Sequence, residues 1–355
     1  MSRSWFTETK GGAERYVYEL SKELMNLGHD VISVSRQGSD LPNKHLKVWS
    51  PGITMVGSAV FSLLGTIKLR TEAIDVAIVN QYWAEMATLY MDMPTIVIMH
   101  DIGLFESSIA QKDRTRHFFR QKVLKRVVKK ASGIIVPSKS TFDHLVRYLD
   151  VPKKKIAFIP EGVDINMFRP SSLESSNRRV LCAGRFAPNK GHLILIEAFK
   201  EFIRRTNWDG ELYLVGYYTE KARDYFREIQ RQTDERIRII TDVSDEELAR
   251  YYQDADICVF PSISDEGWGL TVAEAFASGK PVICSDIFEE TGVASRERAY
   301  IVPRGDVQGL IDALDILIHS PELRASLAKN GFEYAKGLSW EKMTKEIEKV
   351  IYEVA

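Results

Sequence analysis

Residues 265–274 read DEGWGLTVAE, so that two carboxylates, Glu266 and Glu274, stand on either side of a Gly-Trp-Gly turn. The next residues, 275–281, read AFASGKP, and a short helix that begins at the turn would therefore end at a glycine and a proline. Such a turn presents backbone N–H groups at a helix start, where an anion can bind. A carboxylate on each side suggests a ligand with hydroxyl groups beyond its phosphates, as in a nucleotide-sugar. The alternative is a pair of solvated surface glutamates.

Outside this stretch, short apolar runs typical of buried strands alternate with amphipathic stretches along the whole chain. The predicted strands of the first half are 31–35, 76–80, 95–99, 133–137 and 156–160. Those of the second half are 179–183, 212–216, 237–241, 257–261, 281–285 and 299–302. Strands that alternate with helices predict parallel sheets covered on both faces. The chain is therefore predicted to be an α/β protein with two doubly wound, Rossmann-like domains that face a cleft, with ligands beyond the carboxyl ends of the strands.

A Ser-rich link at 170–177 separates the two sets of strands. The prediction is a first domain at 1–168, completed by a charged amphipathic helix within 338–355 that crosses back to it, and a second domain at 169–337. No apolar run of strand length precedes the first helix. We therefore expect the first strand of the first domain to be missing, and we interpret the chain as truncated at its N-terminus.

Composition excludes several classes of protein. The 355 residues include 48 basic and 49 acidic ones, and a net charge of −1 gives no global field for nucleic acid. The three cysteines, Cys182, Cys258 and Cys284, lie in apolar strand-like runs without disulfide or zinc spacing, which indicates buried thiols in a reducing compartment. No signal peptide is visible, and the most apolar stretch, 56–67, is too short to span a bilayer. We expect a cytoplasmic protein.

Two cations stand five residues apart in the loop that follows the predicted strand 179–183. Arg185 can grip two phosphate oxygens at once, and Lys190 adds a point charge. Solvated loop charges would give the same pattern, but a loop at the carboxyl end of a strand favours phosphate binding.

Residues of the first half also point to the predicted cleft. His100 directly follows the strand 95–99, and the pair Gly11 and Gly12 opens the first helix, where a glycine allows the backbone to approach a ligand closely. The alternatives are that His100 is a structural histidine and that Gly11 and Gly12 form an ordinary turn before a helix.

Two further clusters of charge invite a functional interpretation. Asp254 and Asp256 lie between a helix and a strand, which favours turn or cap residues, and we predict no metal site. The segment 112–130 is crowded with lysine and arginine and has a single acidic residue, Asp113. It is either a solvated helix packed on its sheet or a patch for anionic lipid headgroups, assisted by 56–67.

Taken in order, several short motifs resemble one known family. They are Gly11-Gly12, GHDV at 28–31, VPS at 136–138, GVD at 162–164, Gly184-Arg185 with Lys190-Gly191, Pro261-Ser262, the stretch from Glu266 to Glu274, and GKPV at 279–282. On these motifs the chain resembles the retaining glycosyltransferases of the GT-B fold, family 4 (glycosyltransferase group 1).

The resemblance implies a metal-independent transfer of a hexose from a nucleotide-diphosphate sugar to an acceptor hydroxyl, with no cofactor. It implies that Arg185 and Lys190 neutralise the pyrophosphate and that Glu274 holds the ribose. Glu266 would contact the 3- and 4-hydroxyls of the sugar, and His100 would lie near its 6-hydroxyl. The remaining donor-binding residues would be Gly11, Gly12, Gly267, Trp268, Gly269, Leu270 and Thr271.

The resemblance also implies that the acceptor attacks from the side of the leaving group. The chain departs from the family pattern at Glu161, where asparagine is common, at 216–218 and at 286–290. The sequence leaves the donor base, the sugar and the acceptor open, and the acceptor could be a glycolipid, a polysaccharide or a glycan precursor. Two alternative functions are a GT-B nucleotide-sugar epimerase and an inactive nucleotide-sugar-binding protein. We expect peripheral contact with the inner face of an anionic membrane through 112–130, and no nucleic acid.

Overall fold

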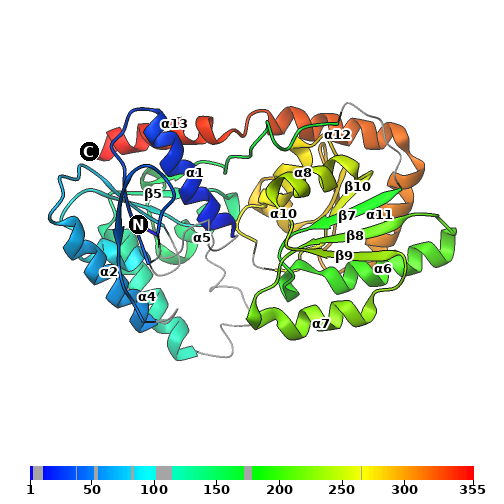
Figure 1. The fold of residues 1–355 in the computed structure, drawn as a ribbon, viewed down its shortest axis with the longest axis horizontal. Coiled ribbons are helices and arrows are strands. Elements are labelled where there is room, and N and C mark those ends of the chain that lie inside the picture. The colour runs from blue at the N-terminus through cyan, green and yellow to red at the C-terminus, as the bar shows by residue number, and fades with distance from the viewer. Residues whose placement is uncertain are drawn as a thin grey trace. The chain divides into compact units, whose positions relative to one another are not determined.

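The computed structural model describes residues 1–2, 11–36, 38–51, 55–80, 84–100, 114–171, 178–264 and 266–355. The chain divides into two compact units (Figure 1). The first comprises Met1–Gly162 with Trp340–Ala355, and the second comprises Val163–Ser339. The sequence-based boundary after residue 168 thus lies within the second unit, whereas the C-terminal helix belongs to the first.

The first unit contains two parallel sheets. One has the order β3-β4-β5-β6, and the other pairs β1 with β2. Their bounds are β1 Ile32–Ser35, β2 Lys44–Lys47, β3 Ala77–Asn80, β4 Thr95–Ile98, β5 Gly133–Val136 and β6 Ile156–Phe158. The sequence did not predict β2, because its four residues, KHLK, are polar at three positions and only half-buried at best.

The first two residues lie between these sheets. The Met1 amine donates to the carbonyl of Ile78, and Asn80 N–H donates to the carbonyl of Met1, both in or beside β3. Ser2 N–H donates to the carbonyl of Val34 in β1. Two residues thus occupy the place where the sequence analysis expected a strand to be missing.

The helices of the first unit cover both faces of the four-stranded sheet. They are α1 Gly12–Asn26, α2 Met55–Leu69, α4 Arg114–Lys130, α5 Lys139–Leu149 and α13 Trp340–Val354, with the 3-10 helices η1 Ala84–Leu89 and η2 Lys153–Lys155. The register aligns Val79, Val97 and Ile134 on one face, which α2, η1 and α4 cover with their buried side chains. On the other face, Gly133 lies against α13.

The second unit has one parallel sheet of order β12-β11-β10-β7-β8-β9. The strands are β7 Arg179–Ala183, β8 Glu211–Gly216, β9 Ile237–Thr241, β10 Ile257–Phe260, β11 Val282–Ser285 and β12 Tyr300–Val302. The helices are α6 His192–Thr206, α7 Arg223–Gln232, α8 Asp245–Asp254, α9 Leu270–Ala277, α10 Ile287–Thr291, α11 Val307–His319 and α12 Pro321–Ala335, with the 3-10 helices η3 Pro188–Lys190 and η4 Glu220–Ala222. The strand order reverses between β7 and β10, which makes their carboxyl ends the expected ligand-binding edge.

Both faces of this second sheet are buried. Leu181 and Cys258 belong to one apolar cluster, whereas their neighbours in the strands, Val180 and Val259, belong to the other. Such two-sided burial explains why these strands are continuous apolar runs in the sequence. Each of the eleven predicted runs coincides with a strand, and the prediction of parallel α/β sheets is confirmed. The three cysteines are buried free thiols, and burial raises the pKa of Cys182 and Cys258 to about 12.

Candidate active site

The loop that follows β7 presents the two predicted cations. Arg185 is exposed and forms no ion pair with any other residue that the structure describes. Lys190 ends the 3-10 helix η3, and the next residue, Gly191, has a φ of 72°. A Cβ at Gly191 would collide with the carbonyl of Pro261, so the start of α6 can pack this closely against the end of β10 only with glycine there.

Lys190 and Glu266 form an ion pair at the centre of this edge. Lys190 Nζ lies 2.6 Å from Glu266 Oε1, and Ser262 Oγ donates to the same oxygen at 2.5 Å. The Glu266 side chain is only 5% exposed, against 23% for Lys190. Ser285 Oγ in turn donates to the carbonyl of Ser262 at 2.6 Å. These contacts link the carboxyl ends of β7, β10 and β11.

Helix α9 begins beside the same loop. Its N-cap, Gly269, has a φ of 118°, and a Cβ there would lie 2.8 Å from the ring of Phe288. Gly269 is therefore required for both backbone conformation and space. No side chain caps this helix end among the residues that the structure describes, so the first-turn N–H groups, including those of Leu270 and Thr271, are oriented for an anion. A Cβ built at Gly184 lies 3.8 Å from the Thr271 methyl, which places this helix start next to the Arg185 loop.

Glu274, the second carboxylate, is 4% exposed and lies in the middle of α9. Tyr252 Oη donates to Glu274 Oε2 at 3.0 Å and is 3.1 Å from the carbonyl of Thr271. Burial, and then the charge of Glu274, raise the pKa of Tyr252 well above its usual value. The phenol therefore stays protonated and holds one oxygen of the carboxylate in place.

In the turn between the two glutamates, the Trp268 side chain is part of the core, whereas Gly267 is accessible to a ligand. The Trp268 ring is 2% exposed and belongs to the core, so any contact of Trp268 with a ligand would come from its backbone. Its carbonyl accepts a hydrogen bond from Thr291 Oγ1 at 2.6 Å. Gly267 is only partly buried.

In the first unit, His100 is buried with a partner at each ring nitrogen. Nε2 lies 2.8 Å from Asn80 Oδ1, and Nδ1 lies 3.2 Å from Glu161 Oε1. The Asn80 amide nitrogen donates to the carbonyl of Ala13, which fixes Oδ1 as the atom that faces His100. In this orientation Nε2 donates to Asn80 Oδ1, and Nδ1 faces the Glu161 carboxylate.

The ring of Tyr16 contacts His100 edge-on at a centroid distance of 4.9 Å. Burial, and then the Glu161 charge, raise the pKa of Tyr16 well above its usual value. Gly11 is the N-cap of α1, and Gly12 is exposed. Among the residues that the structure describes, no atom lies within 4 Å of a Cβ built on Gly12.

The aspartate pair has a structural function. Asp256 accepts a hydrogen bond from the Arg179 backbone at 2.9 Å, and Asp254 pairs with the Arg179 guanidinium at 2.9 Å. Within the described parts of the chain, no group of three or more histidine, cysteine or acidic side chains could hold a metal ion. Over the same residues, no helix combines the length and apolarity needed to cross a bilayer.

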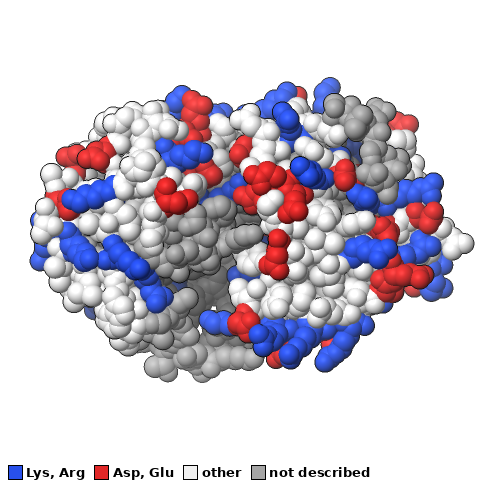
Figure 2. Space-filling view, viewed as in Figure 1, with Lys and Arg blue, Asp and Glu red and all other residues white. Residues whose placement is uncertain are grey.

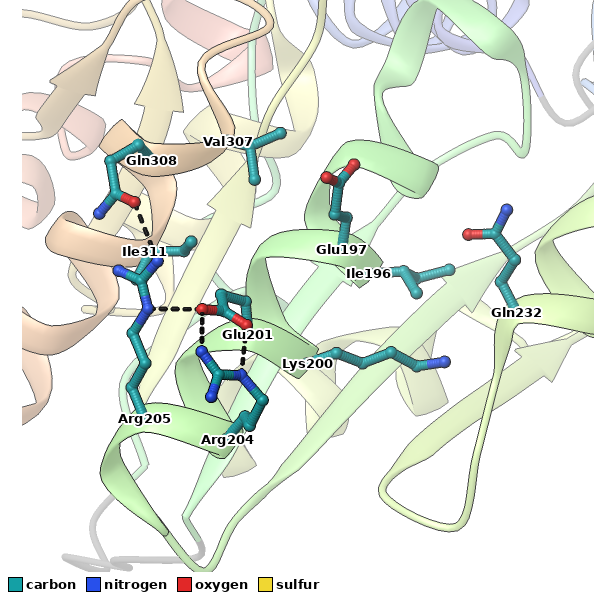
Figure 3. A pocket seen from close by; sticks show the side chains of 10 residues that line it. All are labelled: Ile196, Glu197, Lys200, Glu201, Arg204, Arg205, Gln232, Val307, Gln308 and Ile311. Atoms are coloured by element: carbon teal, nitrogen blue, oxygen red, sulfur yellow. Dashed lines mark hydrogen bonds and ion pairs between the residues drawn. The ribbon is translucent and has the colours of Figure 1, made fainter.

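A surface hollow of about 610 Å³ lies elsewhere on the second unit (Figure 3). It is lined by residues 196–205 of α6, by the start of α11 and by Gln232. Its Arg204 and Arg205 both bind Glu201, and these hydrogen bonds lower the pKa of Glu201 to about 2. Because its cations are already paired and it lies away from the strand ends, this hollow is a poor candidate for the diphosphate.

The sequence analysis missed the side chains that hold the predicted residues in place. Ser262 binds Glu266, Tyr252 binds Glu274, and Asn80 binds His100. Glu161 was noted only as a departure from the family pattern. Asn80 ends β3, and Ser262 follows β10 closely, so their positions at strand ends were an available signal.

Comparisons with known proteins agree with this geometry. A family model described as Glycosyl transferases group 1 matches residues 164–334, and one described as Glycosyltransferase Family 4 matches residues 10–167. A D-inositol 3-phosphate glycosyltransferase of Kribbella flavida is 27% identical over 380 residues, covering 94% of this chain and 89% of that protein.

Solved structures share the fold. A sucrose-phosphate synthase from Thermosynechococcus elongatus aligns with a TM-score of 0.84 at 23% identity, covering 97% of this chain and 93% of that one. The Anabaena protein HepE, solved in complex with UDP-glucose, aligns with a TM-score of 0.79 at 17% identity, covering 99% and 98%. The two parallel α/β units are those of a GT-B enzyme. The chain belongs to the group 1 glycosyltransferases of family 4, as its motifs predicted, and the expectation of a glycosyl-transferring enzyme is confirmed.

Proposed function

We propose that the enzyme transfers a hexose from a nucleoside-diphosphate sugar to an acceptor hydroxyl, with retention of configuration and without a metal ion. The observation that carries this proposal is the cluster of positive groups at one edge of the second sheet. Arg185, Lys190 and the uncapped start of α9 lie on neighbouring loops there. Fixed positive charge at this place would stabilise the diphosphate as it leaves.

In this mechanism the bond between the sugar and the diphosphate breaks first, and the sugar carbon becomes oxocarbenium-like. The acceptor hydroxyl then attacks from the side of the leaving group and gives its proton to a phosphate oxygen. No protein nucleophile is required. This role would suit Glu266 poorly, because its Oε1 already accepts from Lys190 and Ser262. We propose instead that Glu266 binds sugar hydroxyls, that Glu274 binds the ribose, and that His100 lies near the 6-hydroxyl of the sugar.

The UDP and UDP-glucose complexes of HepE make UDP-hexoses the first donors to test. The names of the relatives make D-inositol 3-phosphate the first soluble acceptor to test. For the natural acceptor we propose a hydroxyl of a glycolipid or glycan precursor, with the enzyme in peripheral contact with the inner face of an anionic membrane. The exposed lysines and arginine of α4 support this contact.

A direct test incubates the enzyme with UDP-, GDP- and ADP-hexoses, with and without acceptor, and follows the products by proton NMR. A retained anomer in the transfer product, at a rate unchanged by EDTA, is the expected result. An inverted product, or loss of turnover with EDTA that divalent metal restores, would contradict the proposal. A new nucleotide-sugar epimer would support the epimerase alternative, and the absence of both hydrolysis and transfer would support the inactive binding protein.

A further inference from the structure

Helix α2 carries apolar side chains on its outer side as well as on its buried side. The buried side contains the ring of Phe61 together with Ser58, Ser62 and Thr66, all at most 2% exposed. Its outer side is apolar: Val56 is 65% exposed, and Ile67 is 49% exposed. A surface helix normally buries its apolar stripe and exposes its polar side. Something other than water is therefore expected to cover the outer side of α2.

The outward apolar residues of α2 form one stripe. We define the α2 stripe as the exposed Val56, Leu63, Leu64 and Ile67 with the half-buried Val60. Their spacings of four, three, one and three residues place them on one side of a helix. The helix contains no acidic residue. A contiguous exposed apolar patch marks a binding surface more often than scattered exposed residues do.

An exposed tryptophan belongs to the same region. At the far end of the helix, Lys68 Nζ donates to the carbonyl of Lys47 at 2.7 Å. Trp49, two residues further along the chain, is 71% exposed. Tryptophan is the side chain most typical of the boundary between lipid and water.

Basic side chains lie in the same layer of the first unit. Helices α2 and α4 cover the same face of the sheet, so their outer sides both face away from it. The described residues of α4 include no acid, and those exposed are Phe118, Lys122, Lys125, Arg126, Lys129 and Lys130. In Figure 2, the surface over α2, at the lower left, shows blue and white atoms without a cluster of red ones.

We infer that the α2 stripe inserts into the headgroup boundary of an anionic lipid layer while the cations of α4 bind the headgroups. This inference deepens the membrane contact proposed above. Fifteen residues of helix measure about 22 Å, less than the roughly 30 Å of a bilayer core, so α2 lies in the plane of the interface.

Charge argues against the other possible occupants. A second copy of this chain, paired symmetrically through α2, would bring two sets of lysines together. A protein partner would need a strongly acidic surface around an apolar groove. An anionic lipid layer has negatively charged headgroups above an apolar interior. Each basic residue near its surface contributes about 1 kcal/mol to the binding free energy.

The test is co-sedimentation with sucrose-loaded vesicles of phosphatidylcholine alone or with 30% phosphatidylglycerol. Three proteins are compared: the wild type, Leu63→Ser/Ile67→Ser, and the control Ile316→Ser. Ile316 is an isoleucine on α11 with 40% exposure, similar to Ile67. We expect binding to the anionic vesicles only, a loss of about tenfold or more in the double variant, and no loss in the control. All three should unfold at the same temperature and bind UDP equally.

Equal binding of the double variant and the wild type would overturn the role of α2 while leaving the membrane contact in place. Equal binding to both kinds of vesicle would overturn the charge component. Failure of the wild type to bind either kind would overturn the membrane contact itself, and UDP binding would still test the transferase proposal separately. A dimer in lipid-free solution that Leu63→Ser/Ile67→Ser dissociates would identify a second copy as the occupant and refute the inference.

Discussion

Replacing Lys190 by alanine tests the charge on which the proposed chemistry depends. Lys190 ends the loop after β7 and lies near the start of α9 with Arg185. Loss of one preorganised group that stabilises developing charge lowers turnover by about 10²–10³-fold, or roughly 3–4 kcal/mol of barrier. We therefore expect at least a hundredfold lower kcat for donor hydrolysis and transfer, together with weaker binding of UDP.

The structure adds a second consequence, a loss of stability. Lys190→Ala removes the cation from the Glu266 carboxylate, which is 5% exposed, and leaves the Ser262 hydroxyl bound to it. Breaking a fully buried ion pair costs about 3–5 kcal/mol. Because Lys190 is 23% exposed, water can reach its place, and we expect only about 1–2 kcal/mol. Adding Glu266→Gln should recover most of this stability and none of the turnover.

The assay separates chemistry from folding. Turnover is measured on a UDP-hexose, UDP affinity by calorimetry, and the free energy of unfolding by urea titration. Lys200→Ala is the matched control, since Lys200 is a lysine of the following helix, 42% exposed, whose partner is Asp234 at 3.6 Å. Turnover of Lys190→Ala within threefold of the wild type, despite the expected loss of stability, would show that Lys190 only anchors the loop.

Three further outcomes follow from buried groups. In Glu161→Gln the carboxylate that faces Nδ1 of His100 becomes an amide, which changes the contact that orients the ring. We expect kcat/KM for the donor to fall about tenfold, and an unchanged kcat/KM would show that Glu161 does not position His100. Tyr252→Phe should lower the free energy of unfolding in urea by about 1–2 kcal/mol, because the buried Glu274 carboxylate loses a hydrogen bond. The same change should raise KM for the nucleotide-sugar, and an unchanged KM would argue against Glu274 in its binding site. Burial, and then the Lys190 charge, lower the pKa of His192 from 6.5 to about 3, so the free energy of unfolding decreases as the pH falls from 6.5 towards 3. In His192→Leu the slope of this free energy against pH should be smaller by up to about 1.4 kcal/mol per pH unit. Equal slopes for the variant and the wild type would contradict this.

The sequence predicted the strands well because most of them are buried on both sides. Residues 257–260, ICVF, are all buried and could be read as a strand from apolarity alone. The strand β2 could not be found this way, because its residues are half-buried or exposed and it is held by pairing with β1. Its signal lies in the tertiary structure and not in the local pattern.

The candidate site residues were predicted from their type and their position in the sequence, but their partners depend on contacts between distant segments. Lys190 and Glu266 are 76 residues apart, and His100 and Glu161 are 61 residues apart. No spacing rule connects such pairs. For Trp268 the resemblance to the family implied a role in donor binding, yet its ring is buried in the core beside the turn.

Both carboxylates of the opening stretch are held by neutral hydroxyl donors, Ser262 for Glu266 and Tyr252 for Glu274. A hydroxyl fixes the direction of a carboxylate without neutralising it, and so leaves negative charge and acceptor capacity for the hydroxyls of a sugar or ribose. Glu266 also pairs with a cation, Lys190, at 2.6 Å. If Lys190 binds the diphosphate as proposed, Glu266 and the phosphate share one cation, and sugar binding and diphosphate release would depend on the same side chain. The double variant Lys190→Ala/Glu266→Gln should then regain stability, because no buried charge is left unpaired, without regaining turnover.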